Sequence, residues 1–222
     1  MTDIEHEHRP LRRDAELNRQ RIIEAAREVF AARGVAATFD DVAHRAGVGI
    51  GTVYRRFPTK EALLEVALDE QLEQHVRLAE EALRAPTGWD GLVAFLRETA
   101  RLHAADRGLR DLALGAEIGA RHFEQVRDRV VPLIGAVIDR ARAEGSLRPD
   151  VTVEDLPLLM MMVSEVAHHS HAVRPDAYGR YLQVILDGLR RTGETGELGR
   201  PLSPEDVDAL IRNWLPSAQQ RR

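Results

Sequence analysis

The sequence predicts an all-α fold, and three observations support this prediction. Apolar residues recur at intervals of three and four along successive windows of the chain, which is the pattern of helices with one buried face. Several of these windows begin at a Thr, Ser or Asp that can cap a helix and end at a Gly or Pro. No window shows the sustained alternation of apolar and polar residues that is typical of strands.

The composition limits the classes of protein that remain possible. With 222 residues, of which 44% are hydrophobic and 30% charged, the chain can form one sizeable core or a small domain joined to a larger one. The N-terminus lacks the basic and then apolar order of a signal peptide, and no apolar run is long enough to span a membrane, so we expect a cytoplasmic protein. Because there is no cysteine, disulfides, thiolate catalysis and cysteine zinc sites are excluded.

The first 33 residues divide into an arm and a helix. Residues 1–13 are polar and contain Pro10, so we expect a flexible arm that either stays solvated or contacts an anionic partner through Arg9, Arg12 and Arg13. Residues 14–33 have apolar side chains at helical spacing and end before Gly34. This helix should support the segment that follows by packing Ile22, Ala26, Val29 and Phe30 against it.

Residues 38–60 hold two short helical patterns that are separated by Gly-Val-Gly and end at Phe-Pro. The first helix should run from about Asp40 to Ala46, with Thr38 as its cap and Asp41 in its first turn. Gly47 gives the backbone the freedom that a tight turn needs. Two short helices joined in this way predict a helix-turn-helix.

The second helix should cover about 50–57, because Pro58 disfavours a helical conformation at the residue before it. Val53 and Phe57 are four residues apart and should point into the core. The remaining side chains carry hydroxyl and guanidinium groups, which suit phosphates and the base edges of the major groove. These outward residues are Thr52, Tyr54, Arg55 and Arg56.

The run from Asp41 to Leu64, which reads DVAHRAGVGIGTVYRRFPTKEALL, resembles the DNA-binding signature of TetR-family transcriptional regulators. The resemblance covers roughly residues 18–66 and implies that Tyr54 and Lys60 contact phosphates. One departure is Gly49, where many members have a serine, so a phosphate contact from that hydroxyl is lost. Glycine is still a tolerable helix cap.

The other polar residues of the segment have more open roles. We expect Thr52 and Arg55 to read bases, with Arg55 forming a bidentate contact to guanine, and Thr38 and Arg45 to contact phosphate. The alternative is an exposed polar helix face without a ligand. The net charge of −5 favours local binding, because residues 1–60 hold 11 Lys and Arg against 9 Asp and Glu, whereas the rest holds 20 against 27.

The remainder of the chain predicts a helical body. The first of its helices begins after the cap Thr59 and should connect the DNA-binding segment to the body. Pro132 marks a possible kink, and residues 192–201 look like a linker. The expected helices are 60–83, 89–105, 109–119, 121–144, 154–172, 178–189 and 204–214.

Three histidines near residue 170 leave several interpretations open. Glu165 precedes His168 and His169 by about one turn, and this spacing would suit a metal site if further ligands converged there, such as His103 or His122. A ligand pocket, a dimer interface or a partly exposed helix end are the alternatives for His168, His169 and His171.

The residues that we expect near an effector cavity are chosen from apolar faces of the body helices. Methionines at 160–162 suit an adaptable pocket or a helix interface, although core packing is the favoured interpretation. The candidates are Trp89, Phe95, His103, Leu112, Phe123 and Met160.

The resemblance implies a division into residues 1–60, the N-terminal arm and helix-turn-helix DNA-binding domain, and residues 61–222, a helical effector-binding and dimerisation domain. It implies a homodimer through residues 154–172 and 178–190, and a repressor that a small-molecule effector releases from a palindromic operator. Residues 147–150 resemble the SbtR-like subgroup of the family.

The sequence contains no catalytic constellation, so we expect neither an enzyme nor a cofactor or bound metal. Two alternatives stay open. One is a DNA-binding protein of the same fold whose body only dimerises, and the other is a metal sensor or metal-dependent enzyme that uses the histidines.

Overall fold

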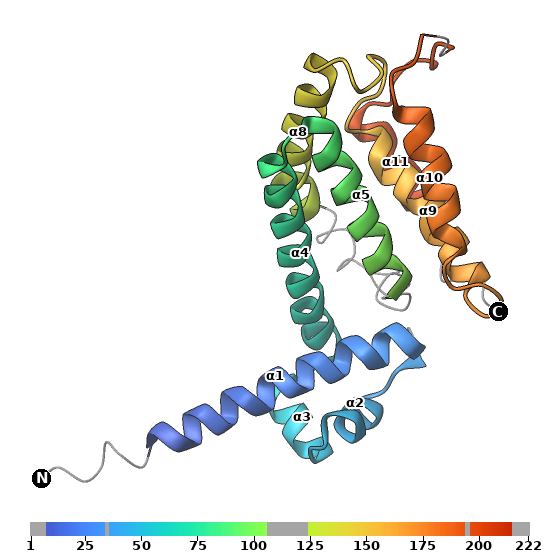
Figure 1. Ribbon diagram of the computed structural model, residues 1–222. Coiled ribbons are helices and arrows are strands. Elements are labelled where there is room, and N and C mark those ends of the chain that lie inside the picture. Colours follow the sequence, from blue (N-terminus) through green and yellow to red (C-terminus); the bar gives the residue numbers. More distant parts are fainter. Residues whose placement is uncertain (1–7, 34–35, 106–123, 194–195, 215–222) are drawn as a thin grey trace, which may run out of the picture.

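The computed structural model describes residues 8–33, 36–105, 124–193 and 196–214. Figure 1 shows three helices packed together at one end, and α4 leading from them into a larger helical body. In the described ranges the only β-type pairing of backbone segments is an isolated antiparallel bridge between Leu147 and Arg190, which confirms the all-α prediction. The helices are α1 (His8–Arg33), α2 (Phe39–Ala46), α3 (Ile50–Arg56), α4 (Lys60–Arg84), α5 (Gly88–Ala105), α8 (Val131–Ala143), α9 (Asp155–Ser170), α10 (Ala177–Leu189) and α11 (Pro204–Trp214).

Helix α1 begins earlier than the sequence predicted. It starts at His8, so the expectation of a flexible arm is wrong for residues 8–13. Pro10 is the third residue of the helix, and proline is tolerated there because the first N–H groups of a helix have no acceptor within it. Residues 1–7 lie outside the described part of the chain.

The first four helices enclose a small core at the N-terminal end of the molecule. Helix α1 contributes Ile22, Ala26 and Phe30, which are buried as expected, whereas Val29 is only partly buried. We call this cluster the N-terminal core, and its other large members are Phe39, Val42, Val53, Phe57, Leu63, Leu64 and Leu68.

Helix α4 belongs to two cores in succession. Its first half ends the N-terminal core at Leu68, and its second half enters the body core at Leu72. The body core contains buried residues from α4, α5, α8, α9 and α10. A continuous helix of 25 residues therefore joins the two cores and can transmit a shift from one to the other.

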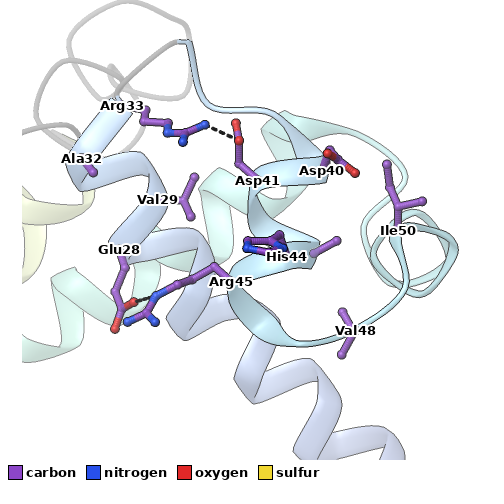
Figure 2. Close-up of a pocket in the computed structure, with 11 residues that line it drawn as sticks. Glu28, Val29, Ala32, Arg33, Asp40, Asp41, His44, Arg45, Val48 and Ile50 are labelled. Atoms are coloured by element: carbon purple, nitrogen blue, oxygen red, sulfur yellow. Dashed lines mark hydrogen bonds and ion pairs between the residues drawn. The ribbon is translucent and has the colours of Figure 1, made fainter.

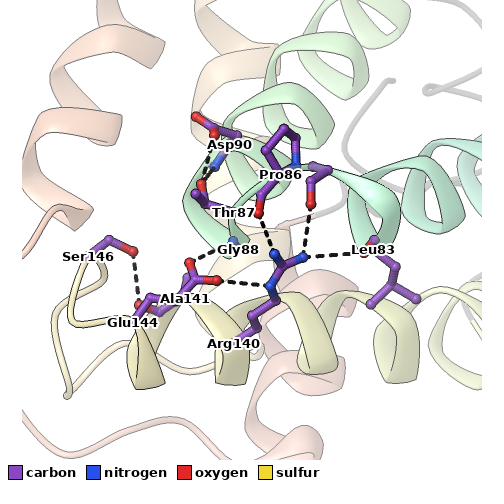
Figure 3. Close-up of polar contacts among 10 residues, drawn as sticks. Leu83, Pro86, Thr87, Gly88, Asp90, Arg140, Ala141, Glu144 and Ser146 are labelled. Atoms are coloured by element: carbon purple, nitrogen blue, oxygen red, sulfur yellow. Dashed lines mark hydrogen bonds and ion pairs between the residues drawn. The ribbon is translucent and has the colours of Figure 1, made fainter.

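Arg140 on α8 fixes the connection between α4 and α5 (Figure 3). Its guanidinium donates to the carbonyl oxygens of Ala85, at 2.9 Å, and Pro86, and its Nε donates to Glu144 at 2.9 Å. Glu144 in turn accepts a hydrogen bond from the N–H of Gly88 at 2.8 Å. The end of α4 that is far from the N-terminal core is thus anchored to the body.

The segment predicted as one helix over 121–144 is broken. Residues 124–129 are helical, Val130 forms a turn, and α8 begins at Val131. Pro132 explains the break, because it has no N–H to bond the preceding turn and prefers the first turn of a helix. The interruption is confined to Val130, which keeps helical dihedral angles and whose N–H still bonds to the carbonyl oxygen of Val126 at 2.8 Å, so it is a local irregularity beside Pro132.

An arginine–aspartate pair holds the segment before α11 against the body. Arg148 is almost fully buried and donates to both carboxylate oxygens of Asp150, at 2.7 and 2.9 Å, and to the carbonyl oxygen of Gly196. Asp150 also accepts from the N–H of Leu198 at 2.8 Å. The bond from Arg148, followed by the bond from Leu198, holds the pKa of Asp150 well below its usual value.

None of the described helices is both long enough and apolar enough to cross a membrane.

Candidate nucleic-acid interface

Helix α2 begins at a complete capping box, as its sequence predicted. The N–H of Asp41 donates to the hydroxyl of Thr38 at 3.2 Å, and the N–H of Thr38 donates to the carboxylate of Asp41 at 3.0 Å. The hydrogen bonds from the hydroxyl and the N–H of Thr38 lower the pKa of Asp41, and Arg33 adds to this effect. These reciprocal bonds fix the direction in which the chain enters the helix-turn-helix.

The turn between α2 and α3 depends on Gly47. Its φ of 67° lies in the left-handed region, where only glycine avoids a steric cost. The N–H of the next residue, Val48, bonds to the carbonyl of Ala43 at 3.0 Å, and this closes the end of α2. Helix α3 then starts at Gly49 without a side-chain cap, as expected.

Helix α3 is held from its inner side and presents polar groups on its outer side. Val53 is completely buried, and Phe57 is 4% exposed in an extended conformation that ends the helix before Pro58. Tyr54 is 54% exposed, and its ring packs edge-on against Phe39 with 4.8 Å between the centroids. The ring of Tyr54 is therefore fixed, which limits the directions that its hydroxyl can take.

The remaining outward residues of α3 form one polar face with Tyr54. Arg55 and Arg56 are exposed, and Thr52 is partly exposed. The guanidinium of Arg55 lies 3.5 Å from the hydroxyl of Thr52, which is a long contact that leaves the guanidinium available to a base or phosphate. The structure thus places Thr52, Tyr54, Arg55 and Arg56 together, as the helical spacing predicted.

Lys60 opens α4 beside this face but has a structural bond of its own. Its Nζ donates to the carbonyl oxygen of Ala37 at 2.7 Å and lies 5.7 Å from the ring centroid of Phe30. These contacts tie the start of α4 to the segment that precedes α2. No local pattern indicates these contacts, because Lys60 is at least 23 residues from both partners along the chain.

Two further residues that were expected to contact phosphate already have partners within the chain. Thr38 caps α2, and Arg45 forms an ion pair with Glu28 on α1. Arg33 of α1 pairs in the same way with Asp41. Sequence reasoning missed Glu28 and Arg33, since their partners are 17 and 8 residues away.

A groove of ≈ 670 Å³ lies between α1 and α2, and the two ion pairs form part of its lining (Figure 2). His44 and Ile50 also line this groove. Its charged groups are of both signs and largely neutralise one another. The groove therefore differs from the outer face of α3, where the described charges are both positive.

The candidate effector residues are dispersed in the body. Phe95 and Met160 are buried in the body core, and Trp89 is partly buried beneath the guanidinium of Arg190, which lies 5.3 Å from the indole ring centroid. The Nδ1 atom of His103 is 3.0 Å from the hydroxyl oxygen of Ser164. Trp89 and His103 lie at opposite ends of α5, about 21 Å apart along its axis. Leu112 and Phe123 lie outside the described residues.

The histidines of α9 do not converge on a metal site in the described structure. The Nε2 atom of His169 lies 3.3 Å from the carboxylate of Glu165, and the rings of His168 and His169 meet edge to face at 4.9 Å. Among the described residues there is no group of three or more His, Asp or Glu that could hold a metal ion. His122 lies outside those residues, and nothing supports a metal sensor or an enzyme.

Two family profiles together match most of the chain. Residues 22–67 match the profile described as bacterial regulatory proteins of the tetR family. Residues 87–191 match the profile described as the C-terminal domain of SbtR-like transcriptional regulators. The second match confirms the subgroup that residues 147–150 suggested.

Individual relatives agree with these profiles. The HTH-type transcriptional regulator SrpR of Pseudomonas putida is 52% identical over 56 residues, which are 25% of this chain and 26% of SrpR. The match thus spans about a quarter of the length of that curated relative. FadR from Bacillus subtilis, solved in complex with stearoyl-CoA, is 20% identical with a TM-score of 0.61, covers 77% of this chain and 98% of its own, and shares the fold.

A longer alignment decides the family. The crystal structure of the TetR transcription regulatory protein from Mycobacterium vanbaalenii is 34% identical, with a TM-score of 0.60, and the alignment covers 82% of this chain and 100% of that one. The chain belongs to the TetR family of bacterial transcriptional regulators, and its C-terminal part is of the SbtR-like type.

Proposed function

We propose that this regulator is a repressor that binds a palindromic operator as a homodimer and leaves it when a small-molecule effector binds the body. The observation that carries the proposal is the outer face of α3, where hydroxyl and guanidinium groups stand on a helix fixed by buried Val53 and Phe57. A rigid helix of this size fits the major groove, where bases present distinct patterns of donors and acceptors.

We assign Thr52 and Arg55 to base contacts, Arg56 to the DNA as well, and Tyr54 and Lys60 to phosphates. The bond from Lys60 to Ala37 does not exclude this role, because an ammonium group carries three donors. For Thr38 and Arg45 the assignment to phosphate requires a competing partner to be given up, the cap of α2 and Glu28 respectively.

Dimerisation through α9 and α10 is supported by apolar side chains that the single chain leaves in solvent. Tyr181 is 51% exposed and Val184 is 63% exposed on α10, and Met162 is 45% exposed on α9. One recognition helix contacts few base pairs, whereas two helices about 34 Å apart read both half-sites of a palindrome. A dimer therefore explains both the exposed surface and the specificity that a repressor needs.

Effector binding in the body would act on the DNA-binding end through α4. This helix is the shared element of both cores, and Arg140 anchors its distal end. A body conformer that tilts α4 would change the spacing of the two α3 helices, and a coupling of about 1 to 3 kcal/mol would alter DNA affinity roughly 5- to 150-fold. The FadR structure shows that this fold accommodates an organic ligand in that protein.

The test is fluorescence anisotropy with labelled DNA from beside the gene and from a random library, in the presence of unlabelled competitor. Tyr54→Ala and Arg55→Ala should each weaken specific binding by about 1 to 3 kcal/mol. Arg101→Ala is the matched control, because Arg101 is an exposed arginine of the body that pairs only with its neighbour Glu98 in the described structure. Equal affinities for all these variants would refute the assignment of α3.

A further inference from the structure

Three helices of the body each carry a pair of polar side chains, four residues apart, at buried or partly buried positions beside the apolar body core. Residues four apart lie on the same face of a helix, so each pair points in one direction. The pairs come from α4, α5 and α9, and Figure 1 shows α5 between the other two helices. We call them the polar belt, which consists of Gln71, His75, Thr99, His103, Ser164 and His168.

His103 connects the three helices of the belt. Its Nδ1 atom lies 3.0 Å from the hydroxyl oxygen of Ser164 on α9, and its ring centroid lies 5.5 Å from that of His75 on α4. His75 is 8% exposed, and its Nδ1 atom lies 2.9 Å from the carbonyl oxygen of Gln71. Since a carbonyl can only accept, the hydrogen of a neutral His75 ring is on Nδ1.

Thr99 is the member of the belt that gives evidence for a ligand-binding site. Thr99 is only 4% exposed, and its hydroxyl has no hydrogen-bond partner among the residues that the structure describes. The Nδ1 atom of His168 is also buried without such a partner. Buried polar groups are nearly always paired in native proteins, so an orphaned hydroxyl one turn before His103 suggests a site that another molecule completes.

The hydrogen-bonding groups of the belt indicate which chemical group of a ligand would bind there. Every member can donate a hydrogen bond, since hydroxyls, imidazoles and an amide all carry donors, and none of the six is a carboxylate. Each member also carries an acceptor, but a set that offers donors and no negative charge is complementary to an anionic group rich in acceptors. A carboxylate meets both conditions.

The residues beside the belt indicate that the rest of the ligand should be apolar. One turn before Thr99 on α5 is Phe95, and one turn before Ser164 on α9 is Met160, both of which are buried in the body core. On α4, the residue one turn after His75 is Ala79, which is also in that core. A polar layer therefore borders an apolar layer, as a site for an amphipathic ligand requires.

We propose that the polar belt binds the acidic head group of a small amphipathic organic acid, with Thr99 and His103 as its main donors and the apolar part directed toward Phe95 and Met160. This inference rests on the proposed function, because it identifies the chemical class of the effector. It also explains how binding reaches the DNA: Gln71 follows Leu68, the last member of the N-terminal core on α4, by less than one turn.

Two fluorescent probes of similar shape test the proposal on the full-length protein. The first is 8-anilinonaphthalene-1-sulfonate, which carries an anionic group, and the second is N-phenyl-1-naphthylamine, which lacks it. The anionic probe should saturate one site per chain and bind more tightly than the neutral probe. Thr99→Val and His103→Gln should each weaken binding of the anionic probe about tenfold or more, because a bond to a charged group is lost, and should change binding of the neutral probe much less.

The variants separate a binding role from a structural one. Thr99→Val keeps the shape of the side chain and removes an unpaired buried hydroxyl, so it should raise the melting temperature while it weakens the anionic probe. A structural role would lower both quantities. His44→Gln is the control, because His44 is an exposed residue of α2 outside the belt, and it should leave the affinity for the probe unchanged.

Equal affinity for the two probes, or unchanged binding of the anionic probe in both belt variants, would overturn the proposal. Operator binding by the wild-type protein without any probe is measured in parallel. If the protein binds its operator but fails the probe test, the belt assignment is wrong and the repressor proposal stands. If operator binding is absent, the repressor proposal fails whatever the probes do.

Discussion

The same substitution, glycine to alanine, should have opposite effects at two helical positions of the body. Gly91 is buried on α5, and a Cβ atom there would lie 2.2 Å from the carbonyl oxygen and 3.0 Å from the carbonyl carbon of Ala82 on α4. These atoms are backbone, so no side-chain rotation can relieve the contact and the two helices must separate. Gly135 on α8 has nothing within 4 Å of the same point.

The magnitudes follow from two opposing effects. Alanine is favoured over glycine inside a helix by about 1 kcal/mol, and this gain applies at both positions. Overpacking of a buried contact costs about 1 to 3 kcal/mol or more, and the severity of the contact at Gly91 places it at the upper end. We therefore expect Gly91→Ala to destabilise the protein by about 1 to 2 kcal/mol and Gly135→Ala to stabilise it by up to about 1 kcal/mol.

Calorimetry and urea unfolding of the two variants beside the wild type test this expectation. For a chain of this length, 1 kcal/mol corresponds to about 2 to 4 °C in melting temperature, so Gly91→Ala should melt about 2 to 8 °C below the wild type. Gly135→Ala should melt slightly above it. A Gly91→Ala protein as stable as Gly135→Ala would refute the close packing of α4 on α5.

Three other predictions concern a helix cap, the pair of Arg148 with Asp150, and the proposed dimer interface. Thr38→Ala removes the capping box of α2 and should cost about 1 kcal/mol in the free energy of unfolding, measured by urea titration, whereas an unchanged midpoint would contradict the cap. Asp150→Asn should lower the melting temperature by a constant amount above pH 4 and by less in stronger acid. Arg148 depresses the pKa of Asp150 from its ordinary value of 3.8, so the stability that the ionised carboxylate provides is lost as the pH falls below that value. If the difference in melting temperature between variant and wild type grew in acid, the sign of this effect would be wrong. Val184→Asp should convert the dimer into monomers in sedimentation velocity and abolish tight operator binding, and a dimer that persists would exclude α10 from the interface.

The helix-turn-helix was predictable because its signals are local. Thr38 and Asp41 are three residues apart, Gly47 adopts the left-handed conformation that its turn requires, and Pro58 ends α3 at the residue before it. Each signal acts within one turn of the chain. A linear pattern therefore contained nearly all the information that positions the outer face of α3.

The contacts that were missed join residues distant in the chain. The bond from Lys60 to Ala37 spans 23 residues, and Arg148 reaches Gly196 across 48 residues. Nothing in the spacing of these residues indicates that they meet. The polar belt is a similar case, because its members look like ordinary polar positions until α4, α5 and α9 bring them together.

The early start of α1 has a different cause. Pro10 normally argues against a helix, and its acceptance in the first turn depends on where the helix begins, which local pattern determines poorly.

The most direct test of the central claim, that α3 reads the operator, is the base preference of variants selected from random DNA. Arg55→Ala should relax the preference at one position of each half-site, with a loss of about 1 to 3 kcal/mol for the preferred base. Lys60→Gln should weaken binding to all sequences alike and reduce the salt dependence by about one phosphate contact. If Arg55→Ala kept the wild-type preference at every position, α3 would not be the element that reads the bases.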